Sequence, residues 1–160
     1  MMYTILPINS KGAREIVTWR YPEPYHVYNL DDNEQGVQEV LDGGFWAVRK
    51  SGDLVGYLCF GVQARVPCGM HKGLYPNSHV DIGLAMRPDL TGQGQGLEFS
   101  QKALEFARQV YETSNLRLTV ASFNERARKV YERAGFQERA RFVNRKPGGD
   151  TEFIIMTSQD

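Results

Sequence analysis

The sequence predicts a mixed α/β domain whose sheet is predominantly antiparallel, with one parallel crossover at its centre. Three observations support this fold class. β-Rich runs separated by glycine-containing turns occur in both halves of the chain, as expected for antiparallel hairpins. Between them a strand, a glycine-rich turn, an amphipathic helix and another strand follow one another, as in a parallel βαβ unit. The chain has 160 residues, 41% of them hydrophobic and 24% charged, which suits one globular domain spanning residues 1–160.

The first part of the chain is predicted to combine two helices with a hairpin. Its elements are a strand at 3–8, a helix at 10–19, a helix at 31–42, and a hairpin of strands 45–50 and 54–62. Ser10 is the candidate cap of the first helix. Pro22 and Pro24 exclude regular helix between the two helices, because proline lacks a backbone donor and restricts the residue before it.

The second part begins with an irregular segment, 63–78, whose prolines and glycines predict a long loop. The elements after it are a strand at 79–87, a helix at 97–111, a strand at 116–122, a helix at 125–134, and a hairpin of strands 136–144 and 151–158. The helix at 97–111 places Phe99, Ala103 and Phe106 on one stripe, which predicts a buried face.

Composition excludes several classes of protein. Nineteen basic and 19 acidic residues balance, whereas a dedicated nucleic-acid binder needs a basic excess. No run of about 20 apolar residues predicts a membrane span, and the N-terminus does not resemble a secretory signal. Two cysteines cannot form a disulfide framework, so we expect a cytoplasmic protein. No cluster has metal-ligand spacing, so no metal is expected.

Charge is unevenly distributed along the chain. Segment 31–42 carries five acidic residues and no basic one, whereas segment 124–146 carries eight basic residues against three acidic ones. Both segments are consistent with ordinary solvated surface. They are also consistent with an acidic rim for a cationic substrate and a basic rim for a phosphorylated cofactor.

The strongest chemical signal is the glycine cluster between the strand at 79–87 and the helix at 97–111. Gly92, Gly94 and Gly96 allow a sharp turn and a close ligand approach. The unpaired amides and the dipole at a helix start attract phosphate. A flexible turn without a ligand is the alternative. The spacing Gly-x-Gly-x-Gly matches neither the dinucleotide fingerprint nor the Walker loop, which needs Gly-Lys-Ser/Thr.

Two motifs together resemble the GCN5-related N-acetyltransferase (GNAT) superfamily. Pro88-Asp-Leu-Thr-Gly-Gln-Gly-Gln-Gly96 is similar to that family's acyl-coenzyme A pyrophosphate loop, with Thr91 where the family has Arg or Gln. Downstream, the run from Asn124 to Phe136 resembles the family's Asn…Ala…Tyr-Glu-x-x-Gly-Phe signature. Order, separation and the predicted elements also agree, so the resemblance covers essentially the whole chain.

The resemblance implies the fold, the cosubstrate and most of the site. The GNAT fold has a single, mostly antiparallel sheet of six to seven strands with about four helices, splayed at strands 4 and 5. The implied reaction is direct attack of an amine on the acetyl-CoA thioester in a ternary complex. The residues expected to bind acetyl-CoA are Leu84, Ala85, Met86, Thr91, Gly92, Gln93, Gly94, Gln95, Gly96, Leu97, Asn124 and Tyr131.

The resemblance also assigns catalytic roles, each with a structural alternative. Tyr131 is expected to protonate the leaving thiolate, although it lies on the stripe of a buried helix face. Asn124 either contacts the cofactor or caps the helix after it. Asp81 is the candidate base, with His79 on the same strand face. Asp81 alternatively belongs to a charge pair, and solvent then removes the proton.

The acceptor is expected to be an amine on a small molecule or on a peptide. Tyr21, Tyr25 and Tyr28 follow the first helix, a region that lines the acceptor cleft in this family. With His79 and Asp81 they are the predicted substrate-binding residues, and an aromatic wall suits a cation. Their alternative role is packing of a loop onto the sheet.

Two other functions remain open at this point. A non-catalytic acyl-CoA-binding regulatory module requires the same glycine loop but only a structural Tyr131. A nucleotide-dependent enzyme using this loop is the second. We expect a monomer or a homodimer, without nucleic acid or membrane as a partner.

Overall fold

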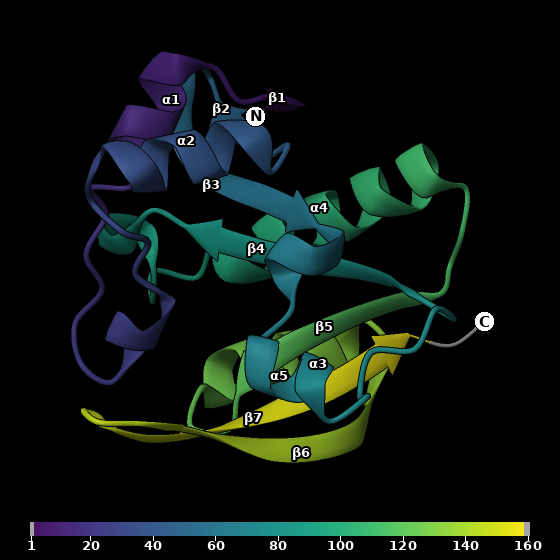
Figure 1. Ribbon diagram of the computed structural model, residues 1–160. Coiled ribbons are helices and arrows are strands. Elements are labelled where there is room, and N and C mark those ends of the chain that lie inside the picture. Colours follow the sequence, from purple (N-terminus) through teal and green to yellow (C-terminus); the bar gives the residue numbers. More distant parts are fainter. Residues whose placement is uncertain (1, 159–160) are drawn as a thin grey trace. The chain divides into compact units, whose positions relative to one another are not determined.

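The computed structural model describes residues 2–158 and divides into two compact units. Unit 1 holds the chain up to Cys59 together with Leu84–Lys102, and unit 2 holds Phe60–Gly83 together with the chain from Ala103 onward. Strand β4 (Val80–Met86) and helix α4 (Gly96–Tyr111) each run through both units (Figure 1). The sheet has seven strands in the order β1-β2-β3-β4-β5-β7-β6, which confirms the predicted fold class. The expectation of one domain spanning residues 1–160 stays a prediction.

Unit 1 is an antiparallel sheet with two short helices. Besides its shares of β4 and α4, it contains β1 (Tyr3–Pro7), α1 (Ser10–Ile16), the 3-10 helix η1 (Tyr25–Tyr28), α2 (Glu34–Asp42), β2 (Trp46–Lys50), β3 (Asp53–Phe60, except its last residue) and the 3-10 helix η3 (Pro88–Leu90). β2 pairs antiparallel with both β1 and β3, so the predicted hairpin is confirmed.

The cap of α1 and the start of α2 differ from the prediction by a few residues. Asn9, not Ser10, caps α1, because its side chain accepts a hydrogen bond from the Gly12 amide at 2.8 Å. Asn33 caps α2 in the same way, so that helix begins at Glu34 rather than at residue 31. In both cases the asparagine carboxamide satisfies an amide that the first helical turn leaves unpaired.

Unit 2 is a three-stranded antiparallel sheet that β4 joins in parallel. Besides its shares of β4 and α4, it contains the 3-10 helix η2 (Gly61–Ala64), α3 (Pro67–His71), β5 (Leu116–Ala121), α5 (Glu125–Arg133), β6 (Phe136–Lys146) and β7 (Gly149–Ser158). Segment 63–78 was expected to be irregular, but it contains the short helix α3, which begins at Pro67. The closing hairpin is confirmed and its strands are longer than predicted, with Lys146 paired to Gly149.

The core of each unit is formed around strands that are buried along most of their length, namely β3 in unit 1 and β5 and the second half of β7 in unit 2. In unit 1, Val48 and Leu58 are almost fully buried, and the Phe45 and Tyr57 rings lie 5.5 Å apart. In unit 2, the buried residues of β5 and β7 meet through the antiparallel register Leu118–Met156 and Val120–Ile154.

Close packing between β3, β4 and α4 in unit 1 depends on one glycine. A Cβ at Gly56 would lie 2.4 Å from Cε1 of Phe99 and 2.6 Å from the Ala85 carbonyl oxygen. Phe99 is buried at the start of α4, so neither the ring nor the backbone has room to retreat.

We therefore expect Gly56→Ala to lower the free energy of unfolding by about 1–3 kcal/mol, the usual cost of overpacking. Urea denaturation measures this change. Gly148→Ala is the matched control, because a Cβ at Gly148 meets nothing within 4 Å. Equal stability of the two variants would contradict this account of the β3–β4 packing.

Candidate functional site

The glycine cluster in unit 1 forms an open turn before helix α4. Gly92 and Gly94 have φ angles of +72° and +79°, a region that favours glycine. The first helical bond runs from the Phe99 amide to the Gln95 carbonyl at 3.1 Å, so Gln95 stands just before the helix. The amides of the first helical turn, beginning at Gly96, have no acceptor within the helix. A Cβ at Gly94 or Gly96 would meet nothing within 4 Å, so the space above these backbone atoms is open.

The polar side chains of this turn are used to brace it. The Thr91 hydroxyl donates to the Pro88 carbonyl at 2.7 Å, and the Gln93 amide donates to the Asp89 carbonyl at 2.7 Å. Asp89 also accepts from Arg87 at 2.6 Å. An anion at this turn would therefore be held mainly by backbone amides and the helix dipole. Thr91, at the position where the GNAT motif has Arg or Gln, uses its hydroxyl hydrogen within the turn, and its expected contact with the cosubstrate stays a prediction.

The edge of β4 in unit 1 offers backbone groups on the side opposite β3. The Arg87 amide donates to the Val55 carbonyl of β3 at 2.8 Å. Because backbone groups alternate along an extended strand, the Ala85 carbonyl also points toward β3, whereas those of Leu84 and Met86 point away. Among the three residues expected to pair with pantetheine, the backbone therefore favours Leu84 and Met86, and Ala85 faces the neighbouring strand.

Tyr21 lies at the same edge of β4. Its hydroxyl donates to the Met86 carbonyl at 2.6 Å, which fixes the segment after α1 against the strand. Burial raises the pKa of Tyr21 well above its ordinary value, so the phenol remains a protonated donor. Tyr25 and Tyr28, the other two aromatic residues expected at the acceptor, lie in η1 and are partly buried.

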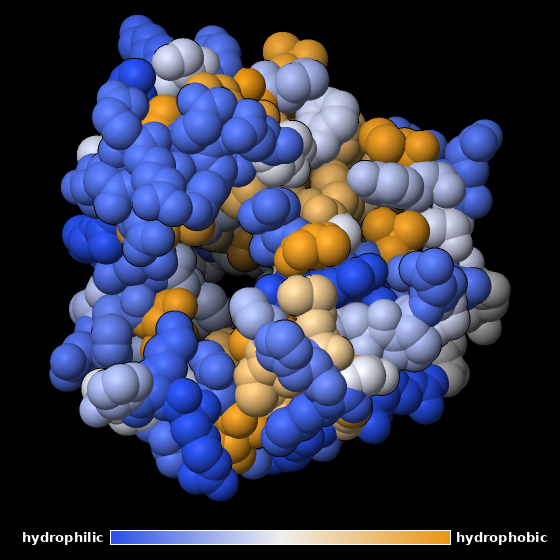
Figure 2. All heavy atoms as spheres, viewed as in Figure 1, coloured by the Kyte–Doolittle hydropathy of each residue, from blue (hydrophilic) through white to orange (hydrophobic). Residues whose placement is uncertain are grey.

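The acidic segment 31–42 is exposed surface. All five of its carboxylates are exposed, and Glu34 forms an ion pair with Arg14 of α1. The outward side of α1 and α2 is covered by hydrophilic residues (Figure 2). This arrangement is the solvated surface that the sequence allowed, and nothing in the geometry of unit 1 reserves it for a cationic ligand.

Asn124 and Tyr131 lie near the two ends of α5 in unit 2. Tyr131 is 9% exposed, and its ring lies 6.2 Å from that of Phe136. The Asn124 side chain accepts a hydrogen bond from the Ala127 amide at 3.3 Å. It therefore caps the helix, which was one of the two roles predicted for it.

Asp81 is enclosed in a buried ion cluster, which argues against its predicted role as the base. The strands β4 and β5 pair in parallel with Asp81 opposite Arg117. Arg117 donates to both carboxylate oxygens at 2.6 and 2.7 Å, and Arg65 donates to one of them at 2.8 Å. The side chains of Asp81 and Arg117 are only 1% and 2% exposed. Because both oxygens are paired and buried, the geometry supports the charge-pair alternative.

His79, which the sequence placed on the same strand face as Asp81, is hydrogen bonded to a different residue. Its Nδ1 is hydrogen bonded to the Ser78 hydroxyl at 2.8 Å. The imidazole instead lines a pocket of about 570 Å³ in unit 2, together with residues of β5, β6 and β7. Substrate binding by His79 or Asp81 at an acceptor site therefore has no support in the geometry of unit 2.

Sequence reasoning missed the arginines that hold Asp81. Arg117 occupies an alternating strand, LRLTVA, where a charged residue usually faces solvent. Tyr75 covers it, with the Arg117 guanidinium 5.2 Å from the ring centre. The signal that was present is a lone acid at the start of one predicted strand and a lone arginine at the start of the next one.

No group of histidine, cysteine and carboxylate side chains in residues 2–158 is arranged to hold a metal ion. No helix in the same part of the chain is long and apolar enough to cross a membrane.

Comparison with known proteins points to one family. The sequence model of the acetyltransferase (GNAT) family matches residues 11–136. A chimera of the spermidine N-acetyltransferase SpeG from Vibrio cholerae and hSSAT superposes with a TM-score of 0.70 at 15% sequence identity, over 99% of this chain and 95% of that one. The ribosomal-protein-S18-alanine N-acetyltransferase from Escherichia coli gives a TM-score of 0.67 at 17% identity, covering 98% and 93%.

A GNAT acetyltransferase from Streptococcus pneumoniae gives a TM-score of 0.64 at 15% identity, covering 98% of each chain. At such identities these likenesses establish the fold alone. The search of curated proteins found no significant match.

The buried cluster predicts a large effect of removing the carboxylate charge. Asp81→Asn leaves Arg117 charged and buried without its counter-ion, so we expect the free energy of unfolding to fall by about 3–5 kcal/mol. Urea denaturation measures this. Asp150→Asn is the control, because its ion pair with Arg145 is exposed and is worth at most about 1 kcal/mol. An Asp81→Asn protein that is fully stable but inactive would restore the catalytic role.

Proposed function

The chain belongs to the acetyltransferase (GNAT) family, and from this premise we propose that it transfers an acetyl group from acetyl-CoA to a primary amine. The amine belongs to a small molecule or to the N-terminus of a peptide or protein. The observation that carries the proposal is the turn before α4, where two glycines with positive φ precede a helix start that opens onto free space. Backbone amides and the helix dipole at such a turn suit the pyrophosphate of coenzyme A.

The backbone of β4 would hold the arm of the cosubstrate. Leu84 and Met86 present their amides on the edge away from β3, where an extended arm can pair as an added strand. One of these amides would also donate to the thioester oxygen as negative charge develops on it. Tyr21, bonded to the Met86 carbonyl, would fix the segment between α1 and α2 at this edge.

The reaction is proposed as a direct displacement. The amine nitrogen attacks the carbonyl carbon of the thioester, the carbon–sulfur bond breaks, and the thiolate takes a proton from the Tyr131 hydroxyl. Solvent removes a proton from the substrate ammonium before the attack, since Asp81 is occupied by Arg117 and Arg65. The second proton, which the nitrogen loses when the amide forms, returns through water to the Tyr131 phenolate. Tyr131 suits a proton donor because its ring is anchored beside Phe136 in the apolar face of α5.

The test of the proposed function is turnover. Acetyl-CoA is incubated with the full chain and a panel of polyamines, aminoglycosides, amino acids and peptides, and release of free thiol is followed. Amine-dependent release supports acetyl transfer. Tight binding of coenzyme A without release for any amine would instead favour the non-catalytic binding module. Stabilisation by ATP or NAD, but not by coenzyme A, would overturn both.

We expect Gly96→Ala to separate cofactor binding from folding. The added methyl group projects into open space in the free protein, and alanine is the better helix former. If a phosphate lies against this amide, the methyl group displaces it, and the Kd for acetyl-CoA should rise by about tenfold, the value of one lost charge-assisted bond. Titration calorimetry measures the Kd. Gly148→Ala, the control in the β6–β7 turn, should leave it unchanged, and equal values for all three proteins would refute the contact.

We expect Tyr131→Phe to lower kcat by about a hundredfold, the lower range for loss of a general acid. The phenyl ring keeps the packing against Phe136, so the free energy of unfolding should change by less than about 1 kcal/mol. Tyr111→Phe, at an exposed position of α4, is the matched control. A kcat for Tyr131→Phe within twofold of the parent would remove this residue from the mechanism.

A further inference from the structure

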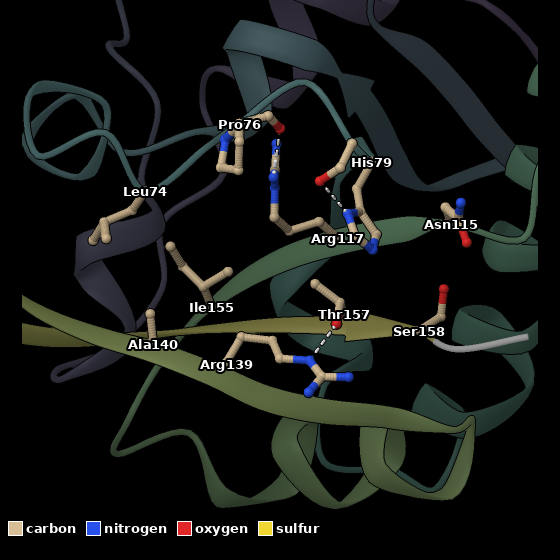
Figure 3. A pocket seen from close by; sticks show the side chains of 11 residues that line it. Leu74, Pro76, His79, Asn115, Arg117, Arg139, Ala140, Ile155, Thr157 and Ser158 are labelled. Atoms are coloured by element: carbon tan, nitrogen blue, oxygen red, sulfur yellow. Dashed lines mark hydrogen bonds between the residues drawn. The ribbon is translucent and has the colours of Figure 1, made fainter.

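An open pocket in unit 2 is lined by cationic and hydrogen-bonding groups, and none of the described residues that line it is acidic. Figure 3 shows it between the segment before β4 and the strands β5, β6 and β7. Its volume is about 570 Å³, and the described residues that line it are Leu74, Pro76, Ser78, His79, Asn115, Arg117, Arg139, Ala140, Ile155, Thr157 and Ser158. None of the residues proposed to contact acetyl-CoA is among them.

The buried cluster behind this pocket carries an excess of positive charge. Arg65 and Arg117 share the single carboxylate of Asp81. Within the described part of the chain neither arginine pairs with a second acid, so the cluster carries one net positive charge, with Arg117 buried and Arg65 partly exposed. A net positive charge beside a pocket attracts an anion. Arg117 is the member of the cluster that reaches the pocket.

Arg139 adds a second cation from β6. Its Nε donates to the Thr157 hydroxyl oxygen at 2.9 Å, which holds the guanidinium against β7 (Figure 3). Among the described residues it forms no ion pair, so its terminal nitrogens have no carboxylate to neutralise them. The Thr157 hydroxyl accepts from Arg139 and can still donate its own hydrogen. A planar guanidinium next to a hydroxyl matches the geometry of a carboxylate or phosphate group.

The same positive charges affect the pKa of His79. Burial and the nearby guanidinium groups of Arg117 and Arg139 lower its pKa, against the opposing effect of Asp81. An anion in the pocket would be attracted by the two cations that disfavour the protonated imidazole.

The apolar residues lie at the other end of the pocket. Leu74, Ala140 and Ile155 gather on one side in Figure 3, and the polar residues on the other. A bare phosphate ion would fill only a small part of this volume. The lining is therefore suited to a ligand that has an anionic group and an apolar body.

We propose that this pocket binds a small molecule that carries a carboxylate or phosphate group on an apolar body, at a site separate from acetyl transfer. The anionic group contacts Arg139 and the Thr157 hydroxyl, and the buried Arg117 adds its positive charge from the wall of the pocket. The body packs on Leu74, Ala140 and Ile155. The proposal does not depend on the proposed function, because no residue of the mechanism takes part.

The test is a titration of the isotopically labelled full chain, followed by amide chemical shifts. The probes are benzoate, phenyl phosphate, inorganic phosphate and the neutral analogue benzamide. We expect benzoate or phenyl phosphate to shift the amides at 78–79, 115–117, 139–140 and 155–158, and the stronger of the two identifies the preferred anionic group. Benzamide should bind at least tenfold more weakly than benzoate. Equal binding of benzamide, or no shifts at these positions, would overturn the proposal.

Two variants separate the charge from the apolar contact. Arg139 is exposed, so Arg139→Gln should fold normally and raise the Kd for the better probe at least fivefold. Arg133→Gln removes the same charge at an exposed position of α5 outside the pocket, and should change the Kd less than twofold. Leu74→Ala should weaken phenyl phosphate but not inorganic phosphate. An equal loss for the two arginine variants would show nonspecific attraction and contradict the site.

Discussion

The pairing of Asp81 with Arg117 is the constraint on which unit 2 depends. It joins the beginnings of the parallel strands β4 and β5, where the recorded register is Val80–Leu116 and Asp81–Arg117. Both ions are almost fully buried, so the pair adds little stability over an apolar pair of the same size. What it adds is specificity, because a shift of one residue would place the carboxylate opposite a leucine and leave both charges unpaired.

The same arginine also holds the segment before β4 against the sheet. Arg117 donates to the Pro76 carbonyl at 2.8 Å and lies against the Tyr75 ring, whose hydroxyl is bonded to Thr119 at 2.8 Å. The Val66 amide donates to that hydroxyl in turn. A stretch rich in proline and glycine is thereby fixed by side chains of β5 rather than by backbone pairing of its own. This explains how it can line a pocket although it contains only short helical turns.

Local sequence patterns were sufficient to predict the elements of the fold. Contacts between residues far apart in the sequence could not be predicted from them. The hairpins and the helices at 97–111 and 125–134 depend on alternation, glycine turns and apolar stripes, all of which act over a few residues. The caps Asn9 and Asn33 were not predicted, because several neighbouring residues can cap a helix and only the backbone angles select one of them. The helix at Pro67 was missed because five residues are too few to show a period.

The candidate site likewise has features that the sequence predicts and features that it does not. The glycine turn before α4 was predictable because positive φ angles and a helix start are encoded within six residues. The role of Asp81 as the base stays a prediction. Its arginine partner could not be predicted, because it lies 36 positions away and an acid on a strand gives no sign of whether its neighbour is a substrate or an arginine. The two units thus offer different groups to an anionic ligand. In unit 1 the glycine turn relies on backbone amides, which need no buried cation, whereas unit 2 keeps a buried arginine excess that sequence-level charge counting cannot reveal in a chain with zero net charge.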